Sequence, residues 1–112
     1  MEQNKIYFHT EDSNGIISIS PDVIAGIAVD ACMETQGVSS MATGPVGSVK
    51  GIAIRINDDK CQVESFIMVR NGFVIADVAK EVQINVKTAI EAACGIRVVK
   101  SDVYVAGIEL KA

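Results

Sequence analysis

Residues 60–94 read KCQVESFIMVRNGFVIADVAKEVQINVKTAIEAAC, and this stretch decides the fold. Apolar residues first alternate with other residues, which is the period of a strand. After Asn71-Gly72 they recur every three or four residues, which is the period of a helix with one buried face. Gly95 follows at the place of a helix C-cap. The sequence therefore predicts a strand over about 61–70 and a long helix from Ala76 to about residue 94.

The flanking segments add two more strands. Downstream, residues 98–110 predict a closing strand in which Gly107 forms a bend or bulge. Upstream, residues 52–56 alternate isoleucine with Ala53 and Arg55, as a strand does. The segment 57–60, Asn-Asp-Asp-Lys, predicts the hairpin turn that joins this strand to 61–70, since Asn and Asp tolerate the left-handed conformation.

A first helix is predicted from Ser20-Pro21-Asp22, which supplies a capping hydroxyl, a fixed φ and a negative charge at the helix start. The helix is expected to end near Thr35. Residues 16–19 predict a first strand, and residues 37–49, rich in Ser and Gly, are expected to form a loop. We take residues 1–14 as an N-terminal segment and 15–112 as one domain.

The predicted order is β-α-β-β-α-β, and its simplest solution is a two-layer α+β sandwich. One mixed sheet would carry both helices on a single face. Right-handed crossovers then favour a ferredoxin-like or similar arrangement.

Composition narrows the class of protein. The chain has 112 residues, room for one core. Val and Ile occur 15 times each against a single leucine, which favours strand and excludes disorder. The net charge of −4 argues against a broad phosphate-binding surface, and no apolar run is long enough to span a bilayer. The polar start, Met1 to Lys5, lacks the features of a signal peptide, so we expect a cytoplasmic chain with free thiols.

Residues that could carry chemistry are few. His9 is the only histidine and lies in the polar N-terminal segment, where no partner for it is visible. Asp58-Asp59 fits a turn better than a cation site. The three cysteines, Cys32, Cys61 and Cys94, are too widely spaced for a zinc site. We therefore predict no catalytic, cofactor-binding or metal-binding residues, and a protein that is not an enzyme.

Two fragments leave a small RNA-binding module open as an alternative. Gly44-Pro45-Val46-Gly47 matches the glycine-x-x-glycine loop of KH domains, although that loop belongs between two helices. Residues 70–74 faintly match the aromatic motif of RNA-recognition (RRM-like) domains, although Phe73 lies past the strand end. An enzyme or small-ligand binder whose pocket leaves no motif is a further alternative.

Apolar residues on both faces of the 61–70 strand exceed what one layer of helices covers. We expect the uncovered sheet face or an edge strand to mediate self-association or partner docking, with Phe66, Met68 and Tyr104 as the contact residues.

Residues 15–108 resemble the alkaline shock protein family of Gram-positive bacteria, the Gls24-type envelope stress response proteins. The resemblance rests on GIISISPDVIAGIA at 15–28, on Gly37-Val38, on IADVAKEVQ at 75–83, and on DVYVAGI at 102–108. The loop 39–49 does not align with the family, and Ala106 stands where an acidic residue is common.

The resemblance implies a non-catalytic cytoplasmic protein of the envelope stress response. It also implies protein partners: further copies of the chain, and a small membrane-anchored protein that holds it near the membrane without insertion of its own. DNA is not an expected partner.

Overall fold

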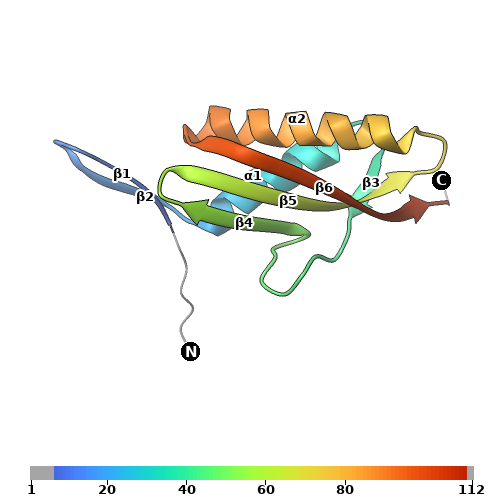
Figure 1. The fold of residues 1–112 in the computed structure, drawn as a ribbon, viewed down its shortest axis with the longest axis horizontal. Coiled ribbons are helices and arrows are strands. Elements are labelled where there is room, and N and C mark those ends of the chain that lie inside the picture. Colours follow the sequence, from blue (N-terminus) through green and yellow to red (C-terminus); the bar gives the residue numbers. More distant parts are fainter. Residues whose placement is uncertain (1–6, 111–112) are drawn as a thin grey trace.

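The computed structural model describes residues 7–110, which form two helices and six strands (Figure 1). In chain order these are β1 (Phe8–Asp12), β2 (Gly15–Ile19), α1 (Pro21–Glu34), β3 (Val38–Met41), β4 (Ile52–Asn57), β5 (Lys60–Arg70), α2 (Ile75–Cys94) and β6 (Arg97–Glu109).

The main sheet is built around β5. Along one edge of β5, β4 pairs antiparallel with its N-terminal half and β3 with its C-terminal end. Along the other edge β6 runs parallel to β5 over its full length. The crossover between these two parallel strands is α2, as a parallel pair requires. The predicted α+β class and mixed sheet are therefore confirmed.

Both helices cover one face of this sheet. α1 packs over β3 and β4, α2 packs over β6, and the helices contact each other. Every second residue of β5 faces them and is buried: Cys61, Val63, Ser65, Ile67 and Val69. The fully buried Ile24 of α1 and Ile90 of α2 belong to the same core cluster.

Local signals fix the helix ends as the sequence predicts. The Ser20 hydroxyl accepts a hydrogen bond from the Val23 N–H, with Pro21 in the first helical position. At the end of α2, Gly95 adopts φ +73°, and its N–H donates to the Glu91 carbonyl. The Glu91 carboxylate accepts from the Val98 N–H at 2.9 Å and from Lys87 Nζ at 3.0 Å, which lowers the pKa of Glu91. These bonds attach the start of β6 to α2.

The expected place of the 16–19 strand is wrong. These residues do form a strand, β2, but β2 pairs only with β1, in a separate two-stranded sheet that projects from one end of the molecule (Figure 1). The single mixed sheet expected from the sequence therefore lacks this strand and contains β3 in addition. Ile16 and Ile17 remain 65% and 59% exposed, whereas Phe8 and Ile19 attach the base of the hairpin to the core.

The expected loop over 37–49 contains a strand. β3 forms because Val38 and Met41 reach the core while the backbone around Ser40 pairs with Met68. The turn between β4 and β5 is confirmed at Asp58, which adopts φ +58°. The predicted irregularity at Gly107 is also confirmed, because the β5–β6 register shifts there and Met68 pairs with Gly107.

Candidate functional site: the open face of the sheet

The sheet face that the helices leave uncovered is the candidate site. Side chains alternate across a strand, so the residues between the buried positions of β5 lie on this open face: Gln62, Glu64, Phe66, Met68 and Arg70. The parallel register places Tyr104 opposite Phe66 and Asp102 opposite Glu64. We call this surface the open face.

An apolar cluster occupies the middle of the open face. The rings of Phe66 and Tyr104 stack, with centroids 4.8 Å apart and planes inclined by 17°. Met68 follows Phe66 on the same face and lies over Gly107, where an added Cβ would come 3.0 Å from Met68 Cε. Tyr104 is 44% exposed, and Phe66 and Met68 are half-buried. The three residues singled out from the sequence are therefore brought together. Their role in binding stays a prediction.

The segment 42–51, between β3 and β4, borders this cluster. The Ala42 N–H donates to the Phe66 carbonyl at 2.8 Å, and the Phe66 N–H donates to the Gly51 carbonyl at 2.9 Å. Gly44 approaches so closely that an added Cβ would come 3.1 Å from Phe66 Cδ1. The loop is thus anchored at both ends on Phe66, and its backbone packs on the half-buried Phe66 ring. No sequence signal indicated this contact.

Beside the apolar cluster, the open face is polar and of mixed charge. A depression of about 70 Å³ is lined there by Ala53, Arg55, Gln62, Val63, Glu64, Lys100 and Asp102. Lys100 Nζ lies 3.7 Å from an Asp102 carboxylate oxygen, a distance at which an exposed pair stabilises little. An apolar centre next to a polar margin is the anatomy of a protein-binding surface.

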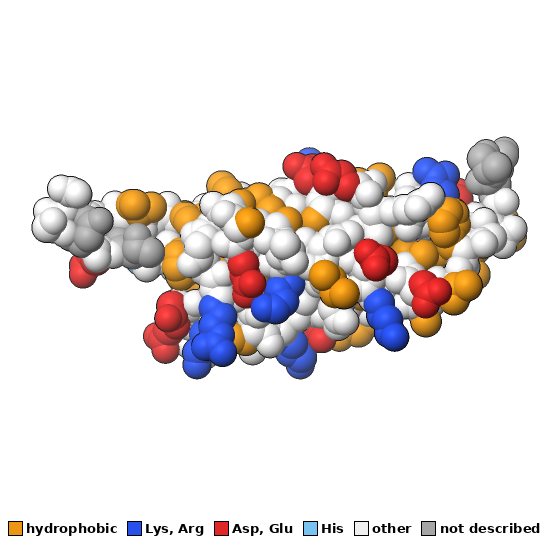
Figure 2. Space-filling model, turned by 90° about the horizontal axis from the view of Figure 1, so that it is seen from above, with side chains coloured by type: hydrophobic (Ala, Val, Ile, Leu, Met, Phe, Trp, Pro, Cys, Tyr) orange, Lys and Arg blue, Asp and Glu red, His pale blue; other side chains and the backbone are white. Residues whose placement is uncertain are grey.

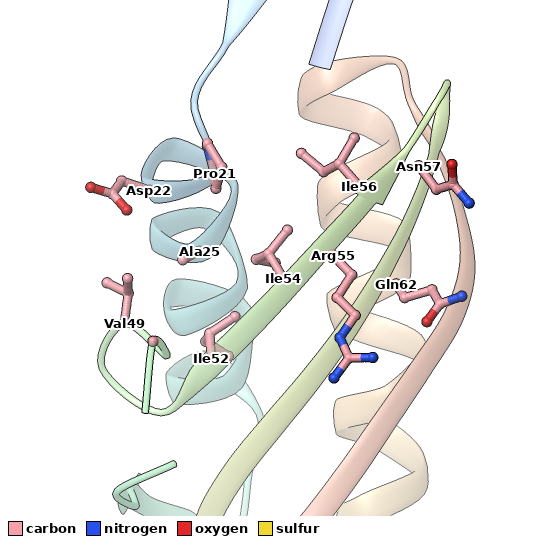
Figure 3. A pocket seen from close by; sticks show the side chains of 11 residues that line it. Pro21, Asp22, Ala25, Val49, Ile52, Ile54, Arg55, Ile56, Asn57 and Gln62 are labelled. Atoms are coloured by element: carbon pink, nitrogen blue, oxygen red, sulfur yellow. The ribbon is translucent and has the colours of Figure 1, made fainter. Parts of the chain in front are cut away.

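A larger hollow, of about 680 Å³, lies between the start of α1 and the outer edge of β4 (Figure 3). Ile52, Ile54 and Ile56 point from β4 towards α1, where Pro21 and Ala25 lie, whereas Asp22 points away from β4. The side of this hollow that faces α1 is therefore apolar, whereas Arg55, Asn57 and Gln62 line its other side. We call this hollow the β4 groove.

The thiols are poor nucleophiles. Burial raises the pKa of Cys32 to about 11, although the neighbouring Ser65 hydroxyl acts to lower it. Burial, with the neighbouring Cys94, raises the pKa of Cys61 to about 11. The pKa of Cys94 is also raised by burial. A thiol that reacts near neutral pH needs the opposite shift.

The other singled-out residues lie apart from the open face. His9 is exposed on the hairpin, where its Nδ1 lies 2.8 Å from Ser18 Oγ. The Gly44–Gly47 motif lies between two strands and not between two helices. Phe73 follows β5 and packs against Gly37. Residues 7–110 contain no group of three or more His, Cys, Asp or Glu side chains placed to hold a metal ion.

On the side of the molecule seen in Figure 2, acidic and basic side chains are interspersed, and neither sign forms a patch. Neither helix between residues 7 and 110 is both long enough and apolar enough to cross a bilayer. The polar start at Met1 to Lys5 lies outside the described residues.

Comparison with known families decides the identity of the domain. The model of the alkaline shock protein 23 family, described as having a cell envelope-related function, matches residues 9–110. The chain belongs to this family. The match covers the hairpin, both helices and the main sheet, so the family resemblance drawn from the sequence is confirmed.

Three relatives of this alkaline shock protein 23 family chain span most of its length. The uncharacterized protein YqhY of Bacillus subtilis is 30% identical to it, over 90% of this chain and 82% of its own length. The uncharacterized protein YloU of the same organism is 27% identical, over 86% of this chain and 90% of its own length. The uncharacterized protein Spy1614 of Streptococcus pyogenes is 26% identical over 94% of this chain and 95% of its own.

Solved structures of MamM CTD variants share the fold. One superimposes with a TM-score of 0.55 at 17% identity, covering 79% of this chain and 95% of its own. Others, in zinc and copper forms, superimpose equally well at 16% identity. At this identity the likeness concerns the fold alone, which is of the ferredoxin-like type that the sequence predicted.

Proposed function

We propose that this chain is a non-catalytic, cytoplasmic protein of cell-envelope homeostasis that works by binding another protein through its open face. The observation that carries the proposal is the Phe66–Tyr104 stack next to Met68. Stacked, half-exposed aromatic residues beside a polar margin are the residues that dominate binding energy in protein interfaces.

The family gives the biological setting, because its function is cell envelope-related. We therefore propose a small membrane-anchored protein as the partner, held by the apolar centre of the open face. The raised thiol pKa values argue against Cys32 and Cys61 as nucleophiles.

Affinity capture from separated membrane and soluble fractions tests the proposal. The bait is the tagged full chain expressed in its own bacterium. Met68→Glu places a charge in the apolar cluster and should abolish capture of a membrane-fraction protein. Ile84→Glu is the matched control, because Ile84 is 57% exposed on α2, away from the open face, and it should capture as the wild type does.

Two results would contradict the proposal. In one, Met68→Glu captures the same membrane protein as the wild type. In the other, capture depends on RNA, is lost after nuclease treatment and weakens steeply with salt, which would favour the RNA-binding alternative.

A further inference from the structure

The outer edge of β4 has unused pairing capacity. Val49 and Ile52 exchange two hydrogen bonds across this edge, at 2.8 and 2.9 Å. Backbone groups alternate in direction along a strand, so Ile54 and Ile56 also direct their N–H and C=O groups outward. Among residues 7–110, no strand pairs with β4 there beyond Ile52.

The isoleucines at this edge form the apolar side of the β4 groove, where Ile52 and Ile56 are buried and Ile54 is half-buried. Ile54 lies along it, with Ala25 of α1 opposite and Val49 at its mouth (Figure 3). An edge strand beside an apolar groove is the geometry that accepts an added strand. The main-chain hydrogen bonds give affinity, and alternate side chains fill the groove.

The β1–β2 hairpin has complementary properties. It carries two uncovered apolar side chains, Ile16 and Ile17, on a strand that projects away from the body of the molecule (Figure 1). Asp12 pairs with Gly15 across its turn, so Ile16 and Ser18 direct their backbone groups away from β1. A two-stranded hairpin is only marginally stable without further packing.

We propose that the hairpin of one copy of this chain docks in the β4 groove of a second copy. β2, with five residues, pairs along β4, with six, and one exposed isoleucine of β2 covers Ile54. The hairpin cannot fill its own groove in the observed conformation, because β2 enters α1 directly through the Ser20 cap and points away from the body. The proposal is independent of the partner assigned to the open face.

This contact joins two different surfaces, so it is head-to-tail. Such contacts build rings or open chains of copies. Each copy would keep its open face available to a different protein, and a string of copies would present that face many times.

Sedimentation equilibrium over a concentration series tests the contact. The wild-type chain should associate beyond its monomer mass of 11.9 kDa. The double variant Ile16→Lys, Ile17→Lys should weaken association at least about tenfold. Both side chains are mostly exposed, so the variant should fold. Ile16→Pro, which removes the outward N–H, should act in the same direction. Val74→Lys, at a site 63% exposed on another surface, is the control and should behave as the wild type.

A mixing experiment separates head-to-tail docking from pairing between two hairpins. The double variant keeps an intact groove. When the variant is in excess, its groove should therefore bind the hairpin of wild-type chains and stop further association. The result should be complexes of one wild-type and one variant copy. The proposal is overturned if the wild type stays monomeric up to about 1 mM, if the double variant associates as the wild type does, or if it fails to enter complexes with it.

Discussion

The eleven residues of β5 alternate between two faces of the sheet, and the two faces differ in what covers them. Towards the helices, on what we call the covered face (Cys61, Val63, Ser65, Ile67 and Val69), its side chains are 0–1% exposed and belong to the core. Towards the open face, polar Gln62 and Glu64 are followed by apolar Phe66 and Met68, which no helix covers. Neighbouring residues of β5 thus differ in their surroundings. The helix-facing residues are buried by this chain, and the open-face residues remain accessible to a partner.

The difference between the two faces can be measured at Ile67 and Met68, which are adjacent in sequence and whose side chains lie on opposite faces of β5. Ile67→Ala should destabilise folding by about 3 kcal/mol or more, because it empties a fully buried site. Met68→Ala should cost less than about 1 kcal/mol. Denaturant unfolding measures both. Equal losses would mean that the open face is part of the fold rather than a binding surface.

The end of the covered face is closed by Gly37, which adopts φ +99°. A Cβ there would come 2.6 Å from Val78 Cγ2 and 3.0 Å from the Phe73 ring. Gly37→Ala should therefore destabilise the fold by about 2 kcal/mol. Gly26→Ala is the control, since Gly26 lies inside α1 with open space around it and should gain about 0.5–1 kcal/mol. A neutral Gly37→Ala would disprove the tight packing assigned to this corner.

Alkaline pH should destabilise the fold through two thiols buried between the helices and the sheet. Cys32 and Cys61 have folded-state pKa values raised to about 11, above the ordinary value of 9.0. Their contribution to the free energy of unfolding is complete below pH 9. It is lost as the pH rises towards 11, because the thiols of the unfolded chain release their protons at a lower pH than the buried thiols do. The loss of stability is on the order of 1 kcal/mol per thiol. The pH slope of stability should shrink in Cys32→Ala, whereas an unchanged slope would assign the effect to other groups.

The smallest effect is expected at Ser65. Its hydroxyl is fully buried on the covered face beside the Cys32 thiol, and no stronger hydrogen-bond partner for it lies within the described residues. Ser65→Ala removes a buried hydroxyl that has only this weakly hydrogen-bonding thiol beside it among the described residues, and it should stabilise the fold by about 1 kcal/mol in thermal unfolding. A loss of stability instead would reveal a partner for this hydroxyl.

The sequence predicted those parts of the fold whose signals are local. α2 follows from its apolar spacing and Gly95, α1 from Ser20 and Pro21, and the β4–β5 turn from Asp58. The strand β3 was missed because its Ser-Ser centre has no strand pattern of its own, so that it forms only by pairing with β5. The place of β2 was wrong because its alternation does not say which strand it joins.

The candidate site was predictable to a similar degree. Phe66 and Met68 share a face by their spacing alone. Tyr104 joins them only through the parallel register of β5 and β6, which depends on the whole crossover. Neither the loop on Phe66 nor the β4 groove has a local signal, since both arise from contacts between distant segments.

Photo-cross-linking in living cells tests directly whether the open face binds a protein, with a photoreactive side chain at Tyr104 and the same group at Ile84 as the comparison. Both positions are about half exposed, one on the open face and one on α2. A cross-link to an envelope protein is expected from Tyr104 and none from Ile84. Equal cross-linking from both positions, or none from Tyr104, would contradict the assignment of the open face as the binding surface.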